Sequence, residues 1–156
     1  MTQGLIQHAG DPQVGELATP INASGFSKAF INNLPAYRPG LSMQRRGLEI
    51  GMAHGYFLYG IFASAGPQRA TEHAGITGLI ATLAIVTLLT IGLSLHGAVR
   101  TGAAGTNATV ANPPAEFGTK EGWSEFASGF LLGGCGGSFF AYLLLQIVPI
   151  TIWSVV

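Results

Sequence analysis

An apolar segment near residue 50 contains two side chains that are able to hold a metal ion. Residues 45–57 read RRGLEIGMAHGYF, in which two arginines precede an apolar stretch that includes the carboxylate of Glu49 and the imidazole of His54. A charged side chain at the centre of a membrane costs roughly 2.5–3.5 kcal/mol on insertion scales. If this segment is a membrane helix, we therefore expect each of the two side chains to have a ligand or a hydrogen-bonding partner.

Helical geometry separates these two side chains. Two residues five positions apart on a helix differ by about 7.5 Å along the axis and by roughly 140° around it. Glu49 and His54 therefore face different directions, which favours two separate ligands over one shared centre. A neutral imidazole offers a lone pair and is a common axial ligand for the metal of a macrocycle. Glu49, nearer the interface, is able to ligate a metal, to pair with Arg45 or Arg46, or to cap a helix.

His96 permits a rival arrangement. If its segment is a helix that returns toward the first membrane face, His96 lies on the same side as His54, and the two imidazoles clamp one haem, as in small cytochrome b-type anchor subunits. The other interpretation of His96 is an interfacial side chain that is hydrogen-bonded to the backbone or to a lipid headgroup. Tyr56, Tyr59 and Trp123 fit an interfacial aromatic belt or the lining of a pigment.

The elements that position these residues follow from the distribution of charge. Charged residues make up 9% of the 156 residues, whereas soluble domains carry about 25%. No Asp, Glu, Lys or Arg occurs between Glu72 and Arg100 or after Glu125. An all-α membrane protein is therefore predicted, and a soluble four-helix protein is the less favoured alternative. Because about 20 residues cross the hydrocarbon, we expect transmembrane helices at about 47–65, 76–98 and 126–148, the first being the weakest.

Basic residues orient these helices. Six of the seven basic residues precede the first span or lie between the second and third, and only Arg69 lies between the first two. The positive-inside rule then places the N-terminus and the loop 99–124 in the cytoplasm. Residues 1–44 contain scattered turn signals and are interpreted as an extended cytoplasmic arm, ordered or bound to a partner. Residues 101–114 are predicted to be flexible, and Pro149 to end or kink the third helix.

Two rows of glycines predict how the helices pack. Small residues four positions apart let helix backbones approach closely in lipid, and such rows occur at Gly47, Gly51 and Gly55 and at Gly129, Gly133 and Gly137. The lone Cys135 is interpreted as a small buried apolar residue. Motifs for nucleophilic, phosphate-binding or zinc chemistry are missing, and the net charge of zero does not favour nucleic acid. The sequence therefore favours a role in binding and assembly over an enzyme.

Residues 33–58, NLPAYRPGLSMQRRGLEIGMAHGYFL, resemble the signature of the photosystem I reaction-centre subunit XI (PsaL) family, and the resemblance extends to residues 10–12, 19–21 and 123–145. It implies that residues 1–156 form one three-helix domain in the thylakoid membrane of a cyanobacterium, with the N-terminus on the cytoplasmic (stromal) side. It also implies bound chlorophyll a and carotenoid (β-carotene), and trimers of the complex in typical cyanobacteria. The implied partners are the photosystem core, its small membrane subunits, neighbouring copies of the chain, and lipids.

The same resemblance assigns roles to individual residues. By position, Glu49 and His54 match the family's chlorophyll ligands on the first helix, each for the magnesium of one pigment. His96 is a weaker candidate ligand, because a pigment is also able to bind through water. Family members often have an acidic residue in the loop after the first helix, associated with calcium at the trimer contact. That loop reads GPQRATEH in this chain, with Ala70 and no carboxylate before Glu72, so a calcium site is not carried over.

Overall fold

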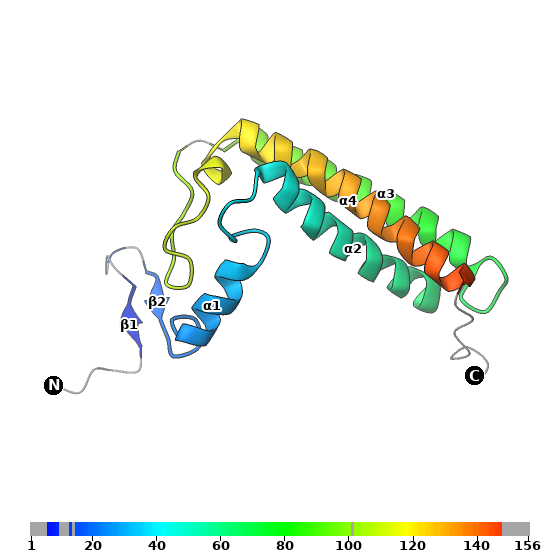
Figure 1. The fold of residues 1–156 in the computed structure, drawn as a ribbon, viewed down its shortest axis with the longest axis horizontal. Helices are drawn as coiled ribbons and strands as arrows, with labels where there is room; N and C mark the ends of the chain where they lie inside the picture. The colour runs from blue at the N-terminus through cyan, green and yellow to red at the C-terminus, as the bar shows by residue number, and fades with distance from the viewer. Residues whose placement is uncertain (1–5, 10–12, 14, 101, 148–156) are drawn as a thin grey trace.

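Three long helices lie side by side along the molecule (Figure 1). The computed structural model describes residues 6–9, 13, 15–100 and 102–147. The three helices are α2 (Met43–Ala65), α3 (Ala74–Ala98) and α4 (Lys120–Ile147). Helices α2 and α4 run in the same direction and α3 runs against them, so the short loop between α2 and α3 lies at the opposite end of the bundle from the loop between α3 and α4.

Two of these helices, α3 and α4, are long and apolar enough to cross a membrane. Helix α2 has similar length but falls short in hydropathy, because Glu49, His54 and its glycines interrupt the apolar residues. This agrees with its prediction as the weakest of the three spans. Helix α4 begins at Lys120 rather than at 126, and the carboxylate of Glu121 in its first turn is favourable near a helix N-terminus. Pro149 lies outside the described residues.

The glycine rows form the contact between α2 and α4, as predicted. A Cβ atom added to Gly47, Gly51 or Gly55 would lie 2.0–2.3 Å from a backbone oxygen of α4. Conversely, a Cβ atom at Gly129, Gly133 or Gly137 would lie 2.0–2.2 Å from a backbone oxygen of α2. The two backbones therefore touch along three helical turns, and side chains larger than hydrogen are excluded from this contact, which we call the glycine seam.

Helix α3 covers one flank of the seam. The side chain of Val86, which has no exposed surface, lies against Gly134 of α4. Toward the loop between α2 and α3, Tyr59 is 1% exposed and packs in a core cluster with Ala63 and Leu79. This face of α2 is enclosed by α3 and α4, so Tyr59 does not belong to a lipid-facing aromatic belt, one of the two roles considered for it.

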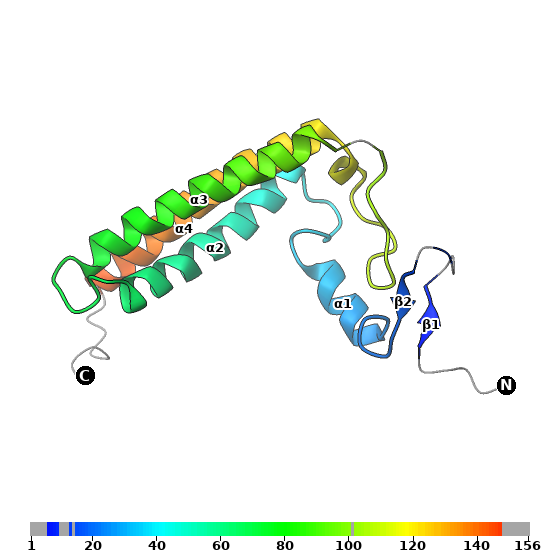
Figure 2. The same ribbon diagram turned by 180° about the vertical axis from the view of Figure 1, so that it is seen from behind.

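The N-terminal arm contains structure that its turn signals did not predict. Strands β1 (Gln7–His8) and β2 (Leu17–Ala18) pair antiparallel, with Gln7 opposite Ala18. Helix α1 (Gly25–Asn33) follows, and its N-cap Ser24 accepts a hydrogen bond from the backbone N–H of Ser27. Figure 2 shows α1 and the strands to one side of the bundle, near the end where α2 begins. The turn signal at residues 10–12 lies outside the described residues.

The loop between α3 and α4 is bound to this arm. The hydroxyl of Thr109 donates to the carbonyl of Asn22 at 2.8 Å, and the amide of Asn32 donates to the carbonyl of Thr109 at 2.9 Å. The backbone N–H of Ala108 donates to the carboxylate of Glu16 at 2.6 Å. The expected flexible connection is thus held by side chains of the arm, which a low-complexity sequence does not reveal.

Candidate functional site

Two arginines bind the carboxylate of Glu49. Arg38 donates from Nη2 to Oε2 at 2.5 Å, and Arg45 donates from Nε to Oε1 at 3.3 Å. The predicted pairing with Arg45 is therefore confirmed. No sequence pattern predicted the contact with Arg38. This residue comes from the arm and reaches Glu49 because the chain turns back at Gly40, where φ is +79°. The Glu49 side chain is 26% exposed and is therefore accessible to a ligand.

Arg46 binds backbone carbonyls of the arm and does not pair with Glu49. Its side chain is buried, and Nη1 donates to the carbonyls of Pro35, Ala36 and Arg38 at 3.0, 3.1 and 2.8 Å. It therefore anchors the end of the arm to α2 and brings Arg38 within reach of Glu49. The alternative of an Arg46–Glu49 pair is wrong for this reason.

His54 presents a lone pair to the surface of the bundle. Its Nδ1 lies 2.8 Å from the carbonyl oxygen of Ile50. Because a carbonyl oxygen only accepts, Nδ1 carries the proton, and Nε2 of the neutral ring is left as an acceptor or metal ligand. The ring packs edge-on against Phe130 of α4, with centroids 5.5 Å apart. This hydrogen bond and ring contact hold the imidazole in one orientation.

A groove of about 350 Å³ adjoins this imidazole, and we call it the His54 groove. Apart from His54 its lining is apolar or aromatic, and it comes from the arm, all three long helices and the loop before α4: Ala36, Tyr37, Ile50, Leu89, Leu93, Phe117, Trp123, Phe126 and Phe130. An apolar groove with one fixed nitrogen ligand is suited to a flat hydrophobic molecule that contains a metal. The sequence singled out His54 and Trp123 but not Tyr37 or Phe117, because Tyr37 lies in a turn of the arm and Phe117 in the short 3-10 helix η2 (Ala115–Gly118) before α4.

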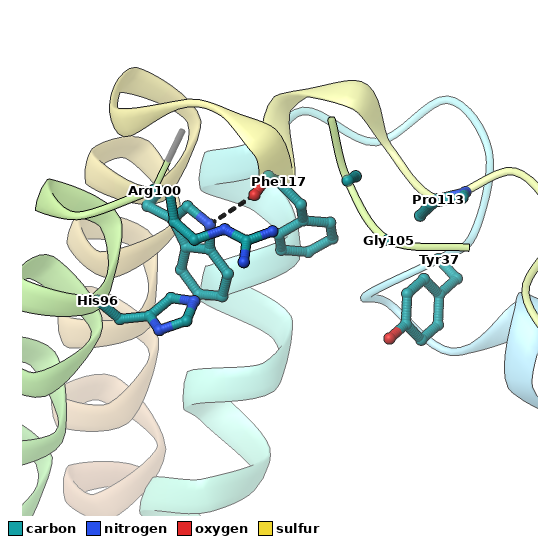
Figure 3. Close-up of a pocket in the computed structure, with 8 residues that line it drawn as sticks. Tyr37, His96, Arg100, Gly105, Pro113 and Phe117 are labelled. Carbon is teal, nitrogen blue, oxygen red and sulfur yellow. Dashed lines mark hydrogen bonds between the residues drawn. The ribbon is translucent and has the colours of Figure 1, made fainter. Parts of the chain in front are cut away.

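His96 lies at a separate and smaller hollow of about 200 Å³, which we call the Arg100 hollow (Figure 3). Its ring contacts Trp123 edge-on, with centroids 4.6 Å apart. The indole N–H of Trp123 donates to the carbonyl of Phe117 at 2.8 Å, the dashed line in Figure 3. Tyr37, Phe117 and Trp123 line both hollows, so they form a wall between His54 and His96.

This arrangement does not bring the two histidines to one iron. His54 is level with Phe130 of α4 and His96 is level with Trp123. At 1.5 Å per residue, these levels differ by about 10 Å along the helix axis. Two axial ligands of one haem must face each other across the metal. Within the part of the chain that the structure describes, no group of three or more His, Cys, Asp or Glu side chains is placed to hold a metal ion either.

The chain is similar to known proteins along nearly its whole length. The family model described as PsaL, photosystem I reaction centre subunit XI, matches residues 5–150. A relative named photosystem I reaction center subunit XI from Picosynechococcus sp. is 63% identical, over 93% of this chain and 95% of its own. Relatives of the same name from Synechococcus elongatus and Mastigocladus laminosus are 58% and 49% identical, over 92% and 86% of this chain and 88% and 78% of their own.

Proposed function

The chain belongs to the photosystem I reaction centre subunit XI family, and on that premise we propose that it is a non-catalytic subunit of photosystem I in the cyanobacterial thylakoid membrane. In this proposal it binds antenna chlorophyll a and carotenoid, and it organises the complex into oligomers. Its partners are the photosystem core, the small membrane subunits, and copies of this chain in neighbouring complexes. The haem-binding alternative is not retained, because the two histidines lie at separate hollows.

The proposed membrane topology has three spans with the N-terminus in the cytoplasm. Support for α3 and α4 comes from their length and apolar composition. Helix α2 joins them because the glycine seam holds it against α4 along three turns, so it crosses the membrane with its neighbour. The arm and the loop between α3 and α4 are bound to each other at one end of the bundle. Together with the adjoining first residues of α2 and α4 they contain six of the seven basic residues, which supports a cytoplasmic position for this end.

The observation that carries the pigment proposal is the free Nε2 of His54 beside an apolar groove. A chlorophyll magnesium accepts one axial ligand from the protein, and when bound the pigment supplies the absorption of light. The residues present fit that group, because the hydrogen bond from Nδ1 to the carbonyl of Ile50 leaves Nε2 as the ligand atom, and the rest of the groove lining is apolar or aromatic. We assign His54 as the ligand of one chlorophyll.

Glu49 is proposed as the ligand of a second chlorophyll on another face of α2. Its carboxylate has about four lone-pair sites, of which Arg38 and Arg45 occupy two. The arginines compensate its charge, so the carboxylate remains ionised beside an apolar pigment at a lower cost than an isolated charge. His96 is not assigned a pigment, because its hollow also contains the charged side chain of Arg100.

The proposals for carotenoid and for oligomers rest on family membership. The loop between α2 and α3 has Ala70, and its Glu72 lies 3.7 Å from His73 with both side chains exposed. A single exposed carboxylate does not support a calcium site there. We therefore propose contact between copies without assigning an ion to it.

Deleting the chain tests the proposed function as a whole. Photosystem I purified without it is expected to contain fewer chlorophyll and carotenoid molecules per reaction centre, and to migrate as a monomer. The measurements are pigment extraction and native electrophoresis of the two complexes. Unchanged pigment content together with unchanged oligomeric state would exclude both parts of the proposal.

The replacement His54→Leu tests the pigment ligand. Leucine fills a similar space but has no lone pair, so we expect the assembled complex to lose about one chlorophyll per chain. Glu49→Leu, which also lacks a lone pair, is expected to remove a different chlorophyll, and the double variant about two, because the ligands are separate. Chlorophyll per reaction centre is measured after the chain has been shown to be present.

The matched control is His73→Leu, because His73 is exposed in the loop between α2 and α3, away from the His54 groove. It should leave the chlorophyll content unchanged. Full pigment content in an assembled His54→Leu complex would refute the ligand assignment.

A further inference from the structure

The Arg100 hollow has charged and polar groups that the His54 groove lacks. It is lined by Tyr37, His96, Arg100, Ala104, Gly105, Pro113, Phe117 and Trp123. Its volume is about 200 Å³. This is enough room for a phosphate-sized group with part of what it is attached to. No role for this hollow follows from the pigment proposal.

Arg100 has a donor without an acceptor. Its Nε is buried and has no hydrogen-bond partner among the described residues. The ion pairs in the described part of the chain involve Arg38, Arg45 and His73, and none involves Arg100. A buried N–H group that lacks an acceptor is costly and rare in folded proteins. Arg46 Nε and the hydroxyl of Tyr59 also lack a partner, but Arg100 differs from them in lining an open hollow, so its guanidinium is able to bind an acceptor of negative charge that is supplied from outside the chain.

Two more donors face the same space. Figure 3 shows the guanidinium of Arg100 reaching from the end of α3 toward Phe117, while the hydroxyl of Tyr37 and the ring of His96 approach from other sides. The indole N–H of Trp123 is already bound to the carbonyl of Phe117 and is not available. The planar fork of an arginine matches pairs of oxygens on phosphate and sulfonate groups. Phe117 and Trp123 add an apolar wall beside these donors.

The position of Arg100, just after the end of α3, indicates where such an anion comes from. The apolar helix ends at Ala98, and Arg100 follows within one turn. If α3 spans the membrane, the guanidinium lies at the depth of the lipid headgroups, on the face with most basic residues. We propose that the Arg100 hollow binds the phosphate or sulfonate group of an anionic lipid headgroup. Arg100 is its charge partner, and Tyr37 and His96 are additional donors.

This inference rests on the proposed membrane placement of α3 but not on either pigment ligand. Its test is the lipid content of purified photosystem I that contains Arg100→Gln. We expect a loss of about one anionic lipid per chain, with neutral lipids and chlorophyll unchanged, measured by quantitative mass spectrometry of extracted lipids. Arg100→Lys should retain most of that lipid, because the charge remains. Tyr37→Phe should weaken retention when the complex is washed with detergent.

The control is Arg69→Gln, which removes an exposed arginine from the loop at the other end of the bundle. It should retain the lipid. An unchanged amount of anionic lipid in the Arg100→Gln complex would overturn the proposal. So would the loss of chlorophyll instead of lipid. Inorganic phosphate is assayed in the same samples, and its loss in place of lipid would overturn the lipid source. If the complex that contains Arg100→Gln does not assemble, the lipid content of the Arg100→Lys and Tyr37→Phe complexes tests the proposal instead. Release of the chain from membranes by alkaline carbonate would separately refute the membrane placement.

Discussion

Replacing Gly51 by alanine is expected to destabilise the contact of α2 with α4, to lower the ratio of docked to undocked helix about 100-fold, and so to reduce the amount of assembled subunit. The added Cβ atom would lie 2.3 Å from the backbone oxygen of Phe130. Overpacking costs typically 1–3 kcal/mol when side chains are able to shift. Here the obstacle is a helix backbone, so the upper end of that range applies, and about 3 kcal/mol corresponds to about two powers of ten in the ratio of docked to undocked helix. The measurement is the amount of the chain in purified photosystem I.

Glycines outside the seam provide the controls. Gly60 lies on the same helix as Gly51, and Gly136 lies on the same helix as Gly133, but a Cβ atom at Gly60 or Gly136 would meet no heavy atom within 4 Å. Gly60→Ala and Gly136→Ala should therefore be neutral or slightly stabilising, because alanine is the better helix former by about 1 kcal/mol. Gly133→Ala should behave like Gly51→Ala. Equal effects inside and outside the seam would contradict this account of the helix contact.

Replacing Arg46 by methionine is the second large effect that we expect. Methionine preserves much of the apolar stem but leaves the carbonyls of Pro35, Ala36 and Arg38 without their donor. A hydrogen bond to a charged group contributes about 1.5–3 kcal/mol, so we expect the docked arm to lose on the order of 3 kcal/mol. Trypsin should then cleave after Lys28 in purified complexes at least tenfold faster. The rate is measured by electrophoresis of timed digests.

The neighbouring Arg45→Met is the matched control. Its side chain is 69% exposed and makes one long contact, 3.3 Å, with Glu49. Exposed ion pairs of this kind contribute roughly 0–1 kcal/mol, so cleavage after Lys28 should change little. If Arg45→Met and Arg46→Met accelerate cleavage equally, the buried arginine does not anchor the arm.

Features that depend on local composition and spacing were predictable from the amino-acid sequence alone. Uncharged runs identified the helices that became α3 and α4, and the four-residue spacing of glycines identified the faces that meet in the seam. Both signals repeat along one helix, so no knowledge of distant segments is needed to detect them. The same holds for the separation of Glu49 from His54, which follows from helical geometry, and for the family resemblance of residues 33–58.

The partner of each functional side chain, in contrast, depends on contacts between segments that are distant in the sequence. Arg38 binds Glu49 because a turn at Gly40 folds the arm back, and Arg46 is buried because that arm covers it. His54 and His96 lie at separate hollows because aromatic residues from loops and from α4 form a wall between them. These contacts join segments with unrelated sequence positions, and their formation depends on how the whole chain closes. Neither periodicity nor composition along one segment contains that information.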